Sequence, residues 1–124
     1  MSTGYPTWKL STKSSTAGTC THVAGTNWST TMADSFTLNY IDSGNNVQTI
    51  WFRNLGTLLR SAPVVYFTVT SNQGEQPNTC NYIVKSLVQN NNVYTIGVQY
   101  VSSSQTTIGS IGSDLSFYYY SSIV

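Results

Sequence analysis

The stretch of sequence that decides the fold is YIVKSLVQNNNVYTIGVQYV, residues 82–101. Two runs rich in β-branched and aromatic residues flank the tetrapeptide QNNN at 89–92, whose residues favour turns. In the second run Tyr94, Ile96 and Val98 alternate with polar residues or glycine, so their side chains share one face of a strand. The stretch therefore predicts a β-hairpin.

A second hairpin is expected in the first half of the chain. Over residues 35–42 the alternation places Phe36 and Leu38 on the same face of a strand. Residues 43–46, Ser-Gly-Asn-Asn, predict a tight turn because glycine and asparagine tolerate positive φ. Residues 47–53 are then expected to return as the next strand.

Short β-rich runs bounded by turn residues continue to the end of the chain. Strands are expected over 64–70 and 115–124, and residues 11–31 are expected to form strands with long connections. No segment shows a convincing 3.6-residue period, so one helical turn over 55–60 is the most that is expected. About eight short strands predict one all-β domain, residues 1–124, an antiparallel β-sandwich or jelly roll with little or no helix.

Polarity in this chain comes from uncharged side chains. Charged residues make up 7% of the sequence, against about 25% in ordinary soluble domains. The chain instead has 18 serines, 18 threonines, 11 asparagines and nine tyrosines. Such a surface binds by hydrogen bonding and stacking, and a formal net charge of +1 gives little repulsion between copies, which favours self-association.

The charge and hydropathy patterns exclude several classes of partner. The five basic residues are scattered and predict no stripe that tracks phosphates, so no nucleic-acid partner is expected. The longest apolar runs, such as 117–120, are far too short to span a bilayer, so no membrane insertion is expected. No leader is visible at the N-terminus. We therefore expect a protein made in the cytoplasm that acts at the virion surface, or an extracellular protein whose leader was removed.

Groups that carry acid–base or metal chemistry are few and dispersed. His22 lies two positions from Cys20, but no third orienting group or oxyanion motif accompanies the pair. Asp42 and the turn at 43–46 offer oxygen ligands but a single carboxylate, so a turn explains them better than calcium. We predict no catalytic residues, no metal and no cofactor, because the carboxylates are not expected to converge in a cleft: Asp34, Asp42, Glu75 and Asp114.

The two cysteines, Cys20 and Cys80, allow two interpretations. A disulfide between them would close a loop of about 60 residues and stabilise the fold by about 4 kcal/mol in the chain-entropy model. Two buried free thiols that act as small apolar residues are the alternative. The sequence leaves both open because it does not reveal the redox compartment.

Aromatic and amide side chains in the expected loops are the candidates for ligand binding. Trp28, beside Asn27 in a polar segment, can stack on the apolar face of a sugar, with a core tryptophan on an edge strand as the equal alternative. Loops over 71–79 and 89–92 add amide and carboxyl groups, each of which is otherwise an ordinary solvated turn residue. The candidates in these two loops are Asn72, Glu75, Asn90 and Asn91.

Three consecutive tyrosines lie near the C-terminus. On a strand they alternate, so Tyr118 and Tyr120 share one face while Phe117 and Tyr119 share the other. If one face packs in the core, the other is available to a partner, and Tyr118 and Tyr120 become candidates for an oligomer interface. A strand that is covered on both faces within one monomer is the alternative.

The segment SFYYYSSI, residues 116–123, is similar in character to the aromatic, serine-rich final strand of adenovirus-type fibre heads. The charge-poor, Ser/Thr/Asn-rich composition and the expected β-sandwich also resemble those viral and phage domains. The resemblance implies a homotrimer that attaches a particle to a cell-surface glycan or protein receptor. It transfers no receptor-binding residue.

These observations predict a non-catalytic viral attachment module that forms a homo-oligomer, with a trimer favoured. The first alternative is a capsid decoration protein or minor structural protein that has no receptor role. Its aromatic C-terminal strand would dock on another coat protein. The second alternative is a small cellular lectin.

Overall fold

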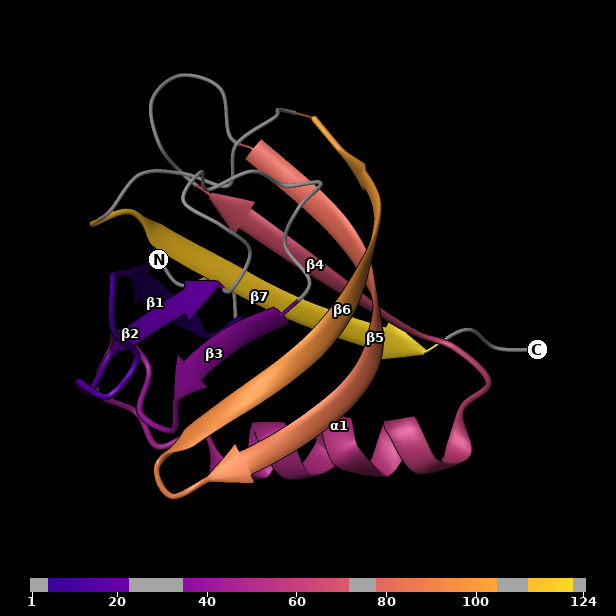
Figure 1. The fold of residues 1–124 in the computed structure, drawn as a ribbon, viewed down its shortest axis with the longest axis horizontal. Coiled ribbons are helices and arrows are strands. Elements are labelled where there is room, and N and C mark those ends of the chain that lie inside the picture. Colours follow the sequence, from indigo (N-terminus) through magenta and orange to yellow (C-terminus); the bar gives the residue numbers. More distant parts are fainter. Residues whose placement is uncertain (1–4, 23–34, 72–77, 105–111, 122–124) are drawn as a thin grey trace.

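The computed structural model describes residues 5–22, 35–71, 78–104 and 112–121. Seven strands and one helix make up this part of the chain (Figure 1). In chain order the elements are β1 (Thr7–Leu10), β2 (Thr19–His22), β3 (Ser35–Asn39), α1 (Thr49–Ser61), β4 (Val65–Ser71), β5 (Asn78–Asn90), β6 (Val93–Ser103) and β7 (Asp114–Ser121).

The strands form one closed barrel in the order β1-β2-β3-β6-β5-β4-β7. Closure comes from the first and last strands, because β1 pairs with β7 through partners such as Trp8 and Leu115. The β1–β2 pair is parallel and every other pairing is antiparallel. The predicted hairpin over 82–101 is confirmed and forms the long ribbon of β5 and β6, which curves around one side of the barrel (Figure 1).

The predicted all-β class is confirmed, but the architecture is a barrel and not the expected sandwich or jelly roll. Each strand buries alternate residues, as the burial of Val65, Phe67 and Val69 in β4 shows. Alternation of this kind is common to sandwiches and barrels, because in both a strand has one inward face. The pairing of strands that are far apart in the sequence, such as β1 and β7, is what distinguishes a barrel from a sandwich.

The expected strand over 47–53 is wrong, because the chain forms the 13-residue helix α1 there. Phe52 and Leu55 are fully buried, and Leu58 and Leu59 pack against the core. These positions recur at three- and four-residue spacing, which is the pattern of an amphipathic helix. The expectation of little or no helix is corrected accordingly.

The turn at 43–46 is confirmed, and Asp42 organises it. Its Oδ1 atom accepts hydrogen bonds from the backbone N–H groups of Gly44 and Asn46, both at 2.9 Å. Its Oδ2 atom accepts a third from the side chain of Gln48 at 2.8 Å. Asn45 has φ of 64°, which asparagine tolerates. The carboxylate therefore stabilises the passage from β3 to α1.

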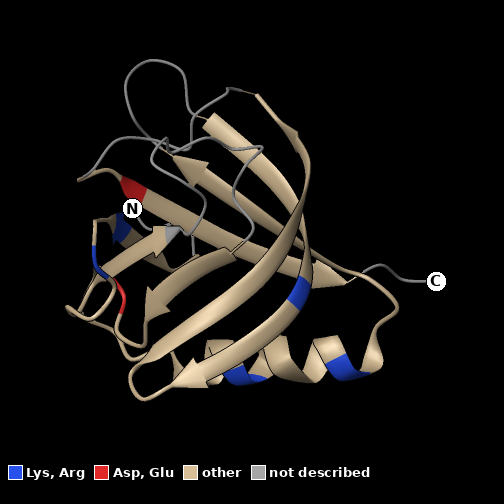
Figure 2. Ribbon diagram, in the orientation of Figure 1, with Lys and Arg blue, Asp and Glu red and all other residues tan. Residues whose placement is uncertain are grey.

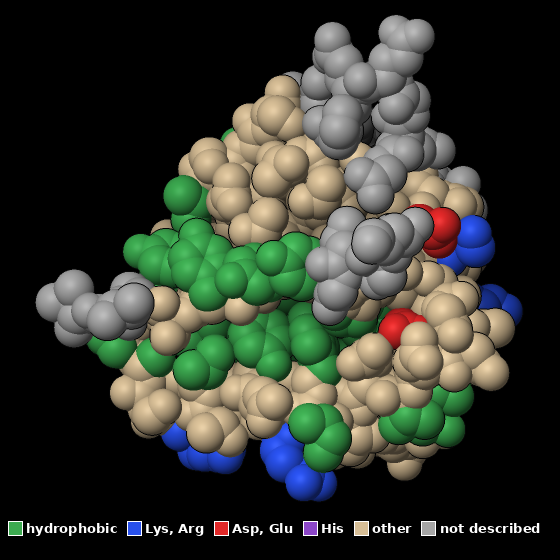
Figure 3. Space-filling view, turned by 180° about the vertical axis from the view of Figure 1, so that it is seen from behind, with side chains coloured by type: hydrophobic (Ala, Val, Ile, Leu, Met, Phe, Trp, Pro, Cys, Tyr) green, Lys and Arg blue, Asp and Glu red, His purple; other side chains and the backbone are tan. Residues whose placement is uncertain are grey.

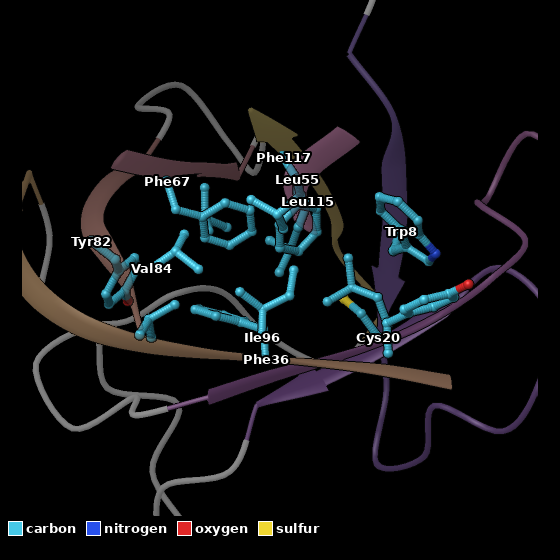
Figure 4. Close-up of a cluster of buried hydrophobic side chains, with 14 of the residues drawn as sticks. Trp8, Cys20, Phe36, Leu55, Phe67, Tyr82, Val84, Ile96, Leu115 and Phe117 are labelled. Atoms are coloured by element: carbon cyan, nitrogen blue, oxygen red, sulfur yellow. The ribbon is translucent and has the colours of Figure 1, made fainter. Parts of the chain in front are cut away.

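The barrel interior is filled with aromatic side chains (Figure 4). The ring of Phe36 lies 5.3 Å from that of Tyr82 and 5.9 Å from that of Phe117. The indole N–H of Trp8 donates to the carbonyl oxygen of Asn39 at 2.8 Å, so the polar atom of the largest core residue is satisfied. Side chains occupy the centre of this barrel, as expected for so few strands.

Helix α1 lies across one end of the barrel (Figure 1). Phe52 stacks on Tyr94 with the ring centroids 3.9 Å apart and an angle of 5° between the planes. The ring of Trp8 lies 5.8 Å from that of Phe52. The hydroxyl group of Tyr119 donates to the carbonyl oxygen of Trp51 at 2.6 Å. The helix is therefore packed against both the hairpin and the final strand.

In the structure Cys20 and Cys80 are both buried and free, which agrees with the free-thiol alternative. They lie on β2 and β5, and the strand order places β3 and β6 between those two strands. A disulfide requires Cα atoms within about 7 Å of each other, which neighbouring strands satisfy and these two do not. Burial raises the pKa of the Cys80 thiol to about 11 and also raises the pKa of Cys20.

Candidate functional site

Four tyrosine side chains form a continuous row on the outer surface of the barrel, which we call the tyrosine column: Tyr5, Tyr118, Tyr120 and Tyr66. Tyr118 and Tyr120 lie on the outward face of β7 with their ring centroids 5.6 Å apart. Tyr66 lies directly opposite Tyr120 on β4, with 5.2 Å between the rings. Tyr5, just before β1, lies 4.5 Å from Tyr118.

The tyrosine column is open to solvent. Tyr5, Tyr118 and Tyr120 are 44%, 38% and 43% exposed, respectively. Figure 3 shows hydrophobic side chains, tyrosines included, gathered in a band on the face of the molecule opposite to that seen in Figure 1. The inward-facing Phe117 of the same strand is fully buried. The alternation predicted for residues 117–120 is therefore present, and the monomer leaves this outer face uncovered.

The ring orientations limit what the tyrosine column can contact. Tyr118 has Tyr5 against one side and Tyr120 against the other, while Tyr120 lies between Tyr118 and Tyr66. The planes of Tyr118 and Tyr120 lie 26° apart and those of Tyr120 and Tyr66 27° apart, whereas Tyr5 is tilted by 42° against Tyr118. Each of the two middle rings therefore has a neighbouring ring on two sides. Binding of a sugar by stacking requires an open ring face, and these neighbours limit the face that is open.

Uncharged hydroxyl and amide groups surround the tyrosine column. On β4, the hydroxyl of Thr68 donates to the Oδ1 atom of Asn81 on β5 at 3.0 Å. Lys9 and Asp114, which are register partners on β1 and β7, form a solvent-exposed ion pair at 3.4 Å. Figure 2 shows how few charged residues the ribbon carries. A second molecule can approach without burying an unpaired charge, which is costly.

A second surface feature, the amide groove, lies beside the β5–β6 turn. It has a volume of about 430 Å³ and is lined by Ser15, Thr37, Asn90, Asn91, Asn92, Val93 and Thr95. Within the described part of the chain, no hydrogen bond engages the side-chain amides of Asn90 and Asn91. The positive φ of Asn91, 58°, is the conformation that its place in the turn requires. The groove presents amide and hydroxyl groups of the kind that hydrogen-bond to polar ligands.

The amide groove brings together two of the residues predicted to bind a ligand, Asn90 and Asn91. The other four candidates lie outside the described residues: Trp28, Asn27, Asn72 and Glu75. The predicted interface residues Tyr118 and Tyr120 lie together in the tyrosine column. Their partners Tyr5 and Tyr66 were missed by sequence reasoning, because strand register is needed to place them.

Among the described residues, carboxylates do not gather at either feature. Asp42 binds the turn before α1, and Asp114 pairs with Lys9 on the barrel edge. Among the described residues, no group of three or more histidine, cysteine, aspartate or glutamate side chains is placed to hold a metal ion. In the same part of the chain, no helix is both long and apolar enough to cross a membrane.

Comparison with known proteins finds no protein-family model, no curated protein and no solved structure that matches the chain.

Proposed function

We propose that the protein is a non-catalytic, self-associating attachment module of a virion, which recognises a glycan or protein receptor on a cell surface. The observation that carries the self-association is the exposed tyrosine column. The similarity of residues 116–123 to the final strand of fibre heads supports the viral assignment and favours a homotrimer. A capsid decoration protein that uses the same face but binds no receptor is the second candidate.

The size of the tyrosine column supports an interface between subunits. With about 200 Å² per tyrosine, the exposed fractions of Tyr5, Tyr118 and Tyr120 amount to roughly 250 Å². Interfaces of standard size bury about 800 Å² on each partner, so the column supplies about a third. At about 25 cal/mol per Å², covering it contributes roughly 6 kcal/mol per subunit before the cost of association. Neutral neighbours such as Thr68 and Asn81 supply the remainder.

The receptor is assigned to the amide groove because the tyrosine column is occupied in the oligomer. Asn90 and Asn91 offer donors and acceptors that suit the hydroxyl groups of a glycan. The groove lies at the β5–β6 turn, whereas the column lies on β7 and β4, so a subunit contact and a receptor contact use different elements.

Sedimentation equilibrium at micromolar concentration tests the self-association. We expect the wild-type protein to sediment as an oligomer and the Y118S/Y120S variant to sediment as a monomer. The matched control is V88S/V101S, which removes two exposed apolar side chains, 57% and 49% accessible, from β5 and β6. This control is expected to retain the wild-type mass. A wild-type protein that sediments as a monomer contradicts the proposal. A Y118S/Y120S variant with the mass of the wild-type oligomer would show that the interface lies outside the tyrosine column.

A glycan array probed with the wild-type oligomer tests the receptor function. We expect binding that is lost in N90A/N91G, in which glycine preserves the positive φ of the turn. Binding that persists in this variant excludes the amide groove as the receptor site. An oligomer that binds no glycan and no cell surface favours the decoration protein.

A further inference from the structure

The groove between α1 and the β5–β6 hairpin, which we call the arginine groove, combines two cations with an apolar floor. Arg53 and Arg60 both line it, three and four residues to either side of Gly56 on one face of the helix. Opposite them, Leu87 and Gln89 belong to β5. Basic residues that are scattered in the sequence thus meet at one site.

Among the described residues, the two guanidinium groups have no acidic partner. In the described part of the chain, the one ion pair joins Lys9 and Asp114, on other elements. Arg60 contacts the hydroxyl of Thr57 at the long distance of 3.5 Å, and both arginines are exposed. Guanidinium groups bind carboxylates through parallel, charge-assisted hydrogen bonds. In the described part of the chain, no carboxylate accepts hydrogen bonds from these two guanidinium groups.

The floor of the arginine groove includes apolar side chains. Leu87 is partly exposed there and Tyr94 is 6% exposed, while the ring of Phe52 is fully buried against Tyr94. Gly56 leaves space between the two sides of the groove, since a Cβ atom there would make ordinary contacts with Leu87 at 3.6 Å and Arg60 at 3.8 Å. The volume is about 260 Å³. Ligand pockets of roughly 300–1,000 Å³ hold drug-sized molecules, so this groove is limited to a small ligand.

We propose that the arginine groove binds a small amphiphilic carboxylate. The apolar body lies on Leu87 beside Tyr94, and the carboxylate accepts hydrogen bonds from Arg53 and Arg60. The apolar floor distinguishes this ligand from a free inorganic anion, which makes no use of it. The site is separate from the tyrosine column and the amide groove, and the proposal does not depend on either.

Titration of the protein (residues 1–124) with octanoate, followed by two-dimensional NMR, tests the proposal. We expect saturable shifts confined to signals of α1 and of residues 87–94. Octanol, which has the same chain without the charge, is expected to bind at least tenfold more weakly. R53Q/R60Q is expected to weaken octanoate binding at least tenfold, since each charge-assisted bond is worth about one such factor. The matched control K13Q lowers the net charge outside the groove and is expected to bind as the wild type does.

Four results overturn the proposal. One is the absence of octanoate binding at 10 mM, and another is equal affinity for octanoate and octanol. A third is unchanged octanoate binding by R53Q/R60Q, whose substituted side chains are exposed. The fourth is equal affinity for inorganic phosphate and octanoate, because the apolar side chains would then contribute nothing.

Discussion

Phe52 packs helix α1 against one end of the barrel, and its truncation to alanine tests how much this packing stabilises the fold. The side chain is fully buried and contacts Tyr94, Trp8 and Trp51. Truncation removes roughly 150 Å² of buried surface, which corresponds to about 4 kcal/mol at 25 cal/mol per Å². Loss of the stack on Tyr94 adds about 1 kcal/mol. We expect F52A to lower the free energy of unfolding by about 4–5 kcal/mol.

Urea denaturation followed by tryptophan fluorescence measures the effect, because Trp8 and Trp51 both lie against the Phe52 ring. The matched control is I50A on the same helix. Ile50 is 60% exposed, so its truncation is expected to change the free energy of unfolding by less than about 0.5 kcal/mol. If F52A is unfolded in water, F52L provides the measurement, with an expected loss of about 1.5 kcal/mol. A cost for F52A within about 1 kcal/mol of that for I50A would refute the packing of α1 on the barrel.

Two further predictions concern buried titratable groups. Native protein without reductant is expected to leave Cys20 and Cys80 unreactive toward Ellman's reagent at pH 8, because burial raises the pKa of the Cys80 thiol to about 11 and raises that of Cys20. Two thiols per chain should react in guanidinium, and a count of zero there would indicate a disulfide. Burial also raises the pKa of Tyr119 to about 12 from 10.0, so the unfolded chain loses this proton first and stability falls as the pH rises from 10 to 12. The variant Y119F should show a smaller fall in stability over this pH range. At pH 7 it should lose about 1 kcal/mol of unfolding free energy, because the hydrogen bond to Trp51 is missing. Urea midpoints that fall with pH as steeply in Y119F as in the wild type would contradict the assignment.

Local alternation was enough to predict most strands. The segments that became β3 to β7 carry inward residues at alternate positions over much of their length, and β5 loses this alternation beyond Val84. The turn at 89–92 sets the register of the adjoining part of the hairpin, as the pairing of Asn90 with Val93 shows. The outward placement of Tyr118 and Tyr120 followed from the same rule. Such patterns report which face of a strand is buried, and they do so within a few residues of sequence.

The helix and the closure of the barrel could not be predicted in the same way. Ile50, Trp51 and Phe52 are consecutive and bulky, which reads as a strand, and the helical spacing emerges when Leu55 and Leu58 are included. The barrel depends on β1 meeting β7 across more than a hundred residues, which no local pattern encodes. Tyr5 and Tyr66 join the tyrosine column through that same long-range register.

The place of β7 in the barrel constrains the order in which the protein can assemble. This strand is made last of the seven, yet it lies between β4 and β1 and pairs along seven positions with the former. A nascent chain that ends before Asp114 has two unpaired strand edges, which are templates for pairing with other chains. Closure of the barrel therefore waits for β7 to emerge from the ribosome, and truncation before Asp114 should yield an aggregating polypeptide in place of a smaller barrel.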